Sequence, residues 1–139
     1  MCGIAGFFGH RSVAAATIDA MRSAIAQRGP DAFHVAGSTQ ADSTFVRQEN
    51  AFGLQRALLH ARLSIRDPRP LADQPMRNGD GSVWLCYNGE VYGWDDDKAF
   101  LQRNGHEFFS TSDTEFILRG YEEWGWEGLL PRLRGMFAL

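Results

Sequence analysis

The chain has 139 residues and a formal net charge of −3. This length fits one domain, residues 1–139, with a hydrophobic core of its own. Hydrophobic residues make up 44% and charged residues 22%, which is ordinary globular usage and excludes disorder and a coiled coil. No cluster of Lys and Arg supplies the basic patch that nucleic acid or an anionic membrane needs. The composition therefore favours a domain that handles small metabolites.

The two cysteines, Cys2 and Cys86, cannot form a disulfide framework, and no C-x-x-C or histidine spacing indicates a metal site. The N-terminal apolar run at 4–8 is short and lacks the preceding basic residues of a secretory signal. No apolar stretch approaches membrane-spanning length. We therefore expect a cytoplasmic protein with reduced thiols, in which Cys86 is a small core residue.

The first half of the chain predicts two strands and a helix. They are a buried strand at 4–8, a helix at 17–27 that ends before Gly29-Pro30, and a strand at 57–65. The polar residues 38–50 predict a loop or a weakly formed hairpin. The proline-rich residues 67–75 predict an irregular, stiff surface segment.

The second half predicts a strand at 83–87 after a turn at 78–81, and then two helices. The first helix covers 95–104, with Phe100 and Leu101 inward. The second begins at a capping box in which Ser112 caps and Glu115 reaches back. Residues 136–139 predict a core strand. Strands and helices alternate without a regular rhythm, which favours an α+β layered domain over a doubly wound parallel sheet.

Cys2 is the first candidate for chemistry. Loss of Met1 would leave Cys2 with a free α-amine, whose pKa of about 7.7–8.0 lets it accept a proton near neutrality. One residue would then carry both the thiol and its base. The alternative is an incidental cysteine near a frayed terminus, but the strand that follows would hold this terminus inside the fold.

Three further sites allow two interpretations each. Asn88 and Gly89 can donate to a developing oxyanion, but Asn-Gly is also the strongest short-range signal for a hairpin turn. Arg62 can grip a carboxylate in a bidentate fork, or form an exposed ion pair with Asp67 or another neighbour. Asp113 can bind an ammonium group, or complement the dipole of the helix that it begins.

Several motifs occur in a specific order. They are Met1-Cys2-Gly3-Ile4-Ala5-Gly6, Arg28-Gly29-Pro30-Asp31, His60-Ala61-Arg62-Leu63-Ser64-Ile65, Gln74-Pro75-Met76, Tyr87-Asn88-Gly89-Glu90-Val91-Tyr92, Ser112-Asp113-Thr114-Glu115 and Leu133-Arg134-Gly135-Met136-Phe137-Ala138. Together they resemble the N-terminal glutaminase domain of glutamine-hydrolysing asparagine synthetases, a class II (N-terminal nucleophile) glutamine amidotransferase. Each motif alone is weak, but their order and spacing cover essentially the whole chain.

The resemblance implies an αββα four-layer sandwich of the N-terminal nucleophile hydrolase type, and a catalytic set. Cys2 would attack the side-chain amide of glutamine and form a thioester that water hydrolyses to glutamate, with release of ammonia. Asn88 and Gly89 would form the oxyanion hole, and Arg28 would organise the nucleophile end.

The resemblance also implies a substrate-binding set. Arg62 would hold the α-carboxylate of glutamine, while Asp113 and Glu90 would hold polar groups that include its α-ammonium. Leu63 and Ile65 would supply backbone groups near the bound amino acid, and Asn88 and Gly89 would contact the amide.

The resemblance implies no cofactor for this domain, and ATP and Mg²⁺ only in a synthetase domain that would use the ammonia, most simply to make asparagine from aspartate. In the family, the domain continues past Met136-Phe137-Ala138 into further strands, so we expect this chain to be incomplete at its C-terminus. Gly93 and Gln27 stand where the family often has Asn and His. Homodimer formation stays open.

The sequence leaves three interpretations of function. The first is an active glutaminase domain that supplies a synthetase domain or subunit. The second is an inactive glutamine-binding fragment, or an amidotransferase for an acceptor other than aspartate. In the third, Cys2 is a redox or structural thiol.

Overall fold

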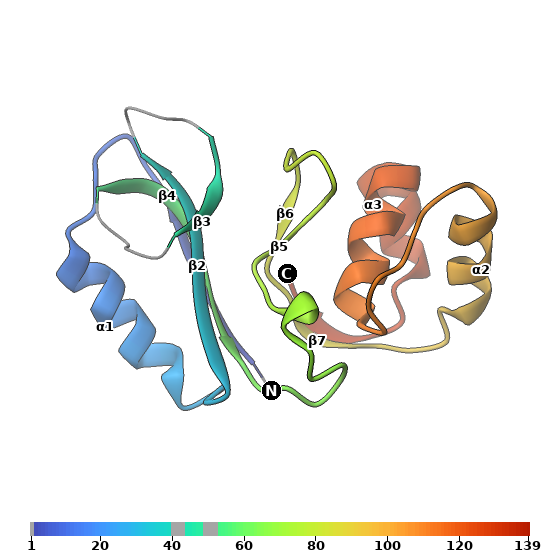
Figure 1. Cartoon of the computed structure of the whole chain (residues 1–139), viewed down its shortest axis with the longest axis horizontal. Coiled ribbons are helices and arrows are strands. Elements are labelled where there is room, and N and C mark those ends of the chain that lie inside the picture. Colours follow the sequence, from blue (N-terminus) through green and yellow to red (C-terminus); the bar gives the residue numbers. More distant parts are fainter. Residues whose placement is uncertain (1, 40–43, 49–52) are drawn as a thin grey trace.

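A computed structural model describes residues 2–39, 44–48 and 53–139 of the chain (Figure 1). Its strands are β1 (Gly3–Phe8), β2 (Ala32–Thr39), β3 (Val46–Gln48), β4 (Leu54–Arg62), β5 (Met76–Arg77), β6 (Trp84–Leu85), β7 (Asn88–Val91) and β8 (Gly135–Ala138). Its α-helices are α1 (Ala15–Ala26), α2 (Asp95–Arg103) and α3 (Asp113–Leu129), and short 3₁₀ helices cover Pro70–Ala72 and Leu130–Arg132. None of the helices in these ranges is long and apolar enough to cross a membrane.

The elements are arranged around antiparallel sheets. The largest sheet has four strands in the order β1-β4-β2-β3, and two smaller sheets pair β5 with β6 and β7 with β8. Helix α1 lies against one face of the large sheet, the short strands lie on its other side, and α2 and α3 lie beyond them (Figure 1). The expected mixture of strands and helices in an α+β domain is confirmed.

Two hydrophobic clusters hold these elements together. One lies between α1 and the large sheet and contains Ile18, Val35, Leu54, Ala57 and Leu59. The other joins the short strands to α2 and α3, and contains Met76, Leu85, Tyr87, Val91, Trp94, Leu101, Phe116, Ile117, Leu118 and Leu129. The fully buried ring of Phe116 stacks on Trp94 with 5.0 Å between ring centroids. The large sheet is therefore backed by one packed cluster, and the short strands are backed by the other.

The turn after α1 is packed directly on the end of β4. Gly29 has no side chain there, and a Cβ atom at this position would lie 2.1 Å from the carbonyl oxygen of Ala61. Asp31 then makes two bonds to the same region: its backbone N–H donates to Arg62 O (3.0 Å), and its carboxylate accepts from Ser64 N–H (2.6 Å). This contact fixes the segment that carries Arg28 beside the first strand.

Five of the predicted elements are confirmed, with shifts of up to three residues at their ends. They are the strands at 3–8 and 54–62 and the helices at 15–26, 95–103 and 113–129. Ser112 is the N-cap of α3, as expected, and accepts a hydrogen bond from Thr114 N–H. Leu101 and Cys86 are buried, also as expected.

The strand predictions around the Asn-Gly pair are wrong in two ways. Only Trp84–Leu85 of the expected strand at 83–87 is a strand, paired with Met76–Arg77. Asn88 and Gly89 do not form a hairpin turn, because they lie in β7 and pair with Ala138 and Phe137 of β8. The partner strand is about fifty residues away in the sequence, so local turn chemistry could not reveal it.

The expected loop or weak hairpin at 38–50 is partly a hairpin. Residues 38–39 end the strand β2, which the sequence analysis did not predict, and β3 at 46–48 pairs with it. The remaining residues of this prediction, 40–43 and 49–50, lie outside the described residues. The proline-rich segment 67–75 is not simply a surface segment, since Ala72, Gln74 and Pro75 are buried.

Three side-chain expectations in the second half are corrected. Phe100 does not point inward but is 39% exposed. Glu115 does not reach back to Ser112, because its carboxylate accepts hydrogen bonds from Phe109 and Ser110. Residues 135–138 do form a strand, but its side chains are exposed rather than part of the core, with Met136 at 74%.

The packing at Gly29 gives a direct test of the fold. Gly29→Ala should lower the free energy of unfolding by about 2–3 kcal/mol, because the added methyl group would meet backbone atoms that cannot rotate away. Gly79→Ala is the matched control, since a Cβ there has no neighbour within 4 Å. Urea unfolding of the two variants measures the difference, and equal stability would contradict the close packing.

Candidate active site

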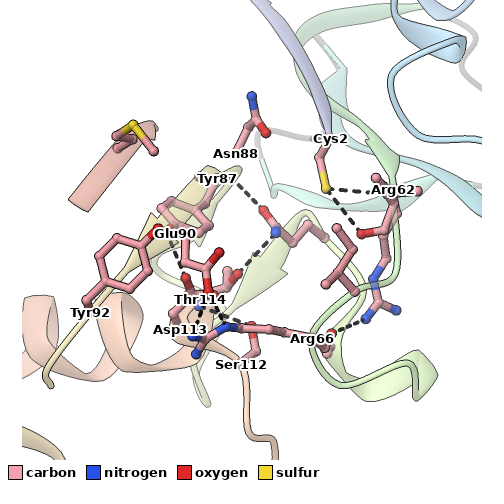
Figure 2. Close-up of a pocket in the computed structure, with 16 residues that line it drawn as sticks. Cys2, Arg62, Arg66, Tyr87, Asn88, Glu90, Tyr92, Ser112, Asp113 and Thr114 are labelled. Carbon is pink, nitrogen blue, oxygen red and sulfur yellow. Dashed lines mark hydrogen bonds and ion pairs between the residues drawn. The ribbon is translucent and has the colours of Figure 1, made fainter. Parts of the chain in front are cut away.

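A cavity of about 250 Å³ lies between the end of the large sheet and the short strands (Figure 2). Its lining comes from the N-terminus, the segment after β4, strand β7 and the start of α3. The lining residues are Cys2, Arg62, Leu63, Ile65, Arg66, Ala72, Gln74, Tyr87, Asn88, Gly89, Glu90, Tyr92, Ser112, Asp113, Thr114 and Met136. Each residue predicted to act on or bind the substrate is among them, and Arg28 is not.

The thiol of Cys2 is held at the edge of this cavity by Leu63, the residue that follows β4. Strand β1 pairs Gly3 with Ala61, which brings Cys2 beside Leu63 at the point where the sheet ends. The backbone N–H of Leu63 donates to Cys2 Sγ at 3.4 Å, and the thiol lies 3.7 Å from the carbonyl oxygen of Leu63. Arg28 Nε donates to the carbonyl oxygen of Cys2 at 3.0 Å. The nucleophile candidate is therefore fixed through both its side chain and its backbone.

Asn88 and Gly89 reach the cavity from β7. Gly89 is packed so closely on β8 that a Cβ would lie 2.4 Å from the carbonyl oxygen of Met136. Asn88 Oδ1 is buried and has no hydrogen-bond partner among the described residues. A buried polar atom without a partner is unusual, and an amide oxygen can only accept, so this atom is free to accept an N–H or O–H of a ligand in the cavity.

Arg62 is buried and its guanidinium is bound by its own chain. Its side chain is 6% exposed and forms an ion pair with Asp73. Nη1 also donates to Arg69 O at 3.2 Å, and Nη2 donates to the carbonyl oxygens of Arg66 and Asp67. Arg62 does form an ion pair, as one of its two interpretations expected, but the pair is buried rather than exposed and its partner is Asp73 rather than Asp67. Arg62 closes the loop that follows β4.

That loop is also tied to the segment before α3. The carboxylate of Asp67 pairs with Arg69 and accepts from Thr111 N–H at 2.8 Å. The hydrogen bonds from Arg69 hold the pKa of Asp67 well below its usual range. On β2, His34 contacts the carboxylate that pairs with Arg62, since its Nε2 lies 3.0 Å from Asp73 Oδ2.

Two carboxylates line the cavity, and they differ in burial and in their hydrogen-bond partners. Asp113 is buried, and its Oδ2 accepts from the hydroxyl of Tyr87 (2.9 Å) and from Val91 N–H (3.1 Å). Glu90 is half-exposed, and its Oε1 accepts from Nε (3.0 Å) and Nη2 (2.7 Å) of Arg66. Burial, together with the charge of Asp113, raises the pKa of Tyr87, so its hydroxyl stays a donor.

Tyr87 is held at three points, although its place in the sequence predicted no role for it in the site. Its backbone N–H donates to Gln74 Oε1, and its carbonyl oxygen faces His60 Nε2 at 3.3 Å. Gln74 continues to Thr114, to which its Nε2 donates at 3.1 Å. Both Gln74 and Tyr87 stand in the motifs that define the resemblance, which is the signal that could have pointed to them.

His60 is fully buried behind the cavity. Burial lowers its pKa to about 4, so the imidazole is neutral at neutral pH. A carbonyl oxygen can only accept, so Nε2 carries the proton and donates to Tyr87. Nδ1 then accepts, and it has no partner among the described residues. His60 therefore supports the strand segment that leads into Asn88.

Comparison with known proteins identifies the class to which this arrangement belongs. The model of the glutamine amidotransferase domain family matches residues 1–139, and the chain belongs to this family of glutamine-dependent enzymes.

The chain is also similar to part of longer curated proteins, which are named as asparagine synthetases. The glutamine-hydrolysing asparagine synthetase 3 of Bacillus subtilis (strain 168) is 34% identical over 145 residues, which cover 99% of this chain and 20% of the relative. The glutamine-hydrolysing asparagine synthetase of Rattus norvegicus is 36% identical over 141 residues, covering 99% of this chain and 22% of the relative. The glutamine-hydrolysing asparagine synthetase 2 of Oryza sativa subsp. japonica is 46% identical over 81 residues, which cover 58% of this chain and 13% of the relative. The chain spans about a fifth of the length of the first two relatives.

The buried imidazole of His60 predicts a pH dependence of stability. Because the native pKa of about 4 lies below the unfolded value of 6.5, the unfolded chain binds the proton more readily. Stability should therefore be unaffected above pH 6.5 and should fall as the pH drops from 6.5 towards 4, by on the order of 3 kcal/mol. Denaturant titrations at pH 7.5, 6 and 5 should show this loss in the wild-type chain.

In His60→Gln the loss over the same pH range should be smaller, since the amide of Gln can donate to Tyr87 without titrating. His10→Gln is the control, because His10 is exposed, and it should keep the wild-type slope. An unchanged slope in His60→Gln would contradict this assignment.

Proposed function

We propose that this chain is a glutaminase domain that hydrolyses glutamine to glutamate and ammonia through a Cys2 thioester. The supporting observation is the cavity, which combines the thiol of Cys2, the side chain of Asn88, and arginine and carboxylate side chains suited to an amino-acid head group. The glutamine-hydrolysing names of the relatives support the same reaction.

Removal of Met1 creates the base in this proposal. The free α-amine of Cys2 takes the proton of the thiol, and the thiolate attacks the carboxamide carbon of glutamine. The bond from Arg28 Nε to Cys2 O at 3.0 Å holds the backbone of this residue while its side chain reacts. Leu63 N–H orients the sulfur.

The negative charge that develops on the carboxamide oxygen needs donors in place before it forms. The Asn88 amide and the Gly89 backbone N–H supply them in this proposal. Gly89 is the residue type that β8 permits at this point, since a side chain would meet Met136 and Phe137. The oxyanion hole and the packing of β7 on β8 thus depend on the same glycine.

The steps balance as a hydrolysis. The tetrahedral intermediate collapses, its C–N bond breaks, and the nitrogen leaves as ammonia with the proton that the α-amine had accepted. A γ-glutamyl thioester remains on Cys2. Water, deprotonated by the same amine, attacks the thioester, and the C–S bond breaks to give glutamate and the free thiol. The sum is glutamine plus water to glutamate plus ammonia.

The head group of glutamine is bound at the other end of the cavity. Arg62 attracts the α-carboxylate, and Asp113 and Glu90 attract the α-ammonium. Leu63 and Ile65 contribute backbone groups, in a segment already shaped by the bond from Ile65 N–H to Leu63 O (3.0 Å). Because both nitrogens of the Arg62 fork are bound to its own loop, Arg62 acts here mainly by its charge and by shaping the cavity wall.

The names of the relatives also support a proposal about the wider setting. We propose that the chain forms one domain of the four-layer N-terminal nucleophile type, acts in the cytoplasm, and passes ammonia to a synthetase domain or subunit that amidates aspartate to asparagine. ATP and Mg²⁺ belong to that partner. Among the described residues, no cluster of three or more His, Cys, Asp or Glu could hold a metal ion, and no step here uses one.

The nucleophile is tested by removing its sulfur. Cys2→Ala should abolish the release of ammonia from glutamine, because no other described thiol faces the cavity. Cys86→Ala is the matched control, since Cys86 is a buried thiol away from the cavity lining whose pKa burial raises to about 12. Ammonia release and the intact mass are measured together, and the active protein should lack Met1. Steady turnover by Cys2→Ala would sink the proposal.

The oxyanion hole is tested separately. Asn88→Ala should lower kcat about 100- to 1,000-fold with little change in KM, because the lost donor acts mainly on the transition state. Asn104→Ala, at the exposed end of α2, serves as the control and should keep wild-type kcat. A normal kcat in Asn88→Ala would remove Asn88 from the catalytic set.

A further inference from the structure

Gln74 lines the cavity, but the proposed reaction gives its side chain no role. The residue is 6% exposed, and both ends of its amide are bonded. Oε1 accepts from the backbone N–H of Tyr87, and Nε2 donates to the hydroxyl of Thr114 at 3.1 Å. A backbone N–H can only donate, so the amide oxygen must face Tyr87 and the amide nitrogen must face Thr114. The orientation of the Gln74 side chain is therefore fixed by its partners.

The two partners of Gln74 stand next to site residues on separate elements. Tyr87 directly precedes Asn88, the first residue of β7, and Thr114 directly follows Asp113, the first residue of α3. One buried side chain thus joins the strand that carries the proposed oxyanion hole to the helix that carries a carboxylate for the head group. The two bonds span 13 and 40 positions in the sequence, so they follow from the fold and not from a local pattern.

The backbone on both sides of Gln74 is held from the large sheet. Arg47 on β3 donates through Nη2 to the carbonyl oxygens of Asp73 (3.2 Å) and Pro75 (3.1 Å), the two neighbours of Gln74. The carboxylate of Asp73 pairs with the buried Arg62. A side chain can hold its partners in place only if its own backbone is fixed. Gln74 meets this condition, and it connects the large sheet with β7 and α3.

Loss of the Gln74 amide would affect the two ends of the cavity unequally. Asp113 keeps its own bonds, because its Oδ2 accepts from the hydroxyl of Tyr87 and from Val91 N–H. The backbone N–H of Tyr87 would instead lose its acceptor, one residue before Asn88. The carbonyl oxygen of Tyr87 would still be bonded by His60, so the displacement of Asn88 would be partial. The alignment of the oxyanion hole is therefore the property that depends on Gln74.

We propose that Gln74 is a positioning residue that aligns Asn88 with the carboxamide of a glutamine bound at the start of α3. It acts through the backbone of Tyr87 and contacts no reacting atom. This inference rests on the proposed function, because the reaction that Gln74 aligns is the one proposed for the cavity. Gln74 lies outside the set of site residues that the sequence predicted.

A double-mutant cycle on ammonia release tests the inference. Gln74→Met keeps the length of the side chain without its amide, and it should lower kcat about 10-fold with KM changed less than about 2-fold. In the Asn88→Ala background the same substitution should lower kcat less than about 2-fold, since the residue through which it acts is gone. Gln102→Met, on the exposed side of α2, is the matched control and should keep the kcat of its parent in both backgrounds. An equal loss in both backgrounds would overturn the inference, because a merely structural role does not depend on Asn88.

A second variant decides the question if Gln74→Met does not fold. Thr114→Val keeps the size of this buried residue and removes the acceptor of Gln74 Nε2, while the bond from Tyr87 N–H remains. It should lower kcat about 3-fold, because the amide of Gln74 keeps only one of its two anchors. This loss should also disappear in the Asn88→Ala background. A loss of the same size in both backgrounds, or in neither, would contradict the positioning role.

The two proposals fail in different ways. If the wild-type chain releases ammonia and the losses from Gln74→Met and Asn88→Ala are independent, the inference alone fails. If the losses are coupled but Cys2→Ala still turns over steadily, the thioester of the proposed function fails and the positioning of Asn88 by Gln74 stands. If the wild-type chain releases no ammonia from glutamine, Gln74 has no reaction to align, and both fail.

Discussion

The fixation of Tyr87 is the constraint on which the site depends. Its backbone N–H is bound by Gln74, its carbonyl oxygen by His60, and its hydroxyl by Asp113, so contacts from β4, the loop after it and α3 meet on one residue. Tyr87 directly precedes Asn88. The position of β7 relative to Cys2, the residue before β1, is thereby set by buried hydrogen bonds, and such bonds cost free energy when one partner is lost. The neutral imidazole of His60 behind the cavity supplies one of these buried hydrogen bonds.

The two arginines at the cavity differ in burial, and therefore in how firmly their ion pairs hold the structure. The pair of Arg62 with Asp73 is buried, and removing one partner would leave a charge without compensation. That pair, with the carbonyl oxygens around it, keeps the loop after β4 in one shape. The pair of Arg66 with Glu90 stands in partial contact with water and is easily exchanged. The buried pair therefore holds the cavity wall more firmly than the half-exposed pair does.

Local signals in the sequence account for much of the fold. The periodic apolar residues of α1, the N-cap Ser112 and the strand that holds Cys2 could all be predicted, because each depends on neighbours within a few residues. The strand β7 could not, since its Asn-Gly pair resembles a turn until Gly135–Ala138 pairs with it. The grouping of the site residues came from the family resemblance. The ion pair of Arg66 with Glu90 joins residues 24 apart and left no local pattern to detect.

In the proposed function, the separation of the two ends of the cavity would select a substrate by the length of its side chain. Cys2 and Asn88 lie towards one end in Figure 2, and Arg66 and Asp113 lie towards the other. An amino acid held by its head group presents its carboxamide to the thiol only when its side chain spans this separation. Asparagine, one methylene shorter, would lose about 1–3 kcal/mol of contact, and a misplacement of about 1 Å at the reacting atoms can cost a further 100-fold in rate.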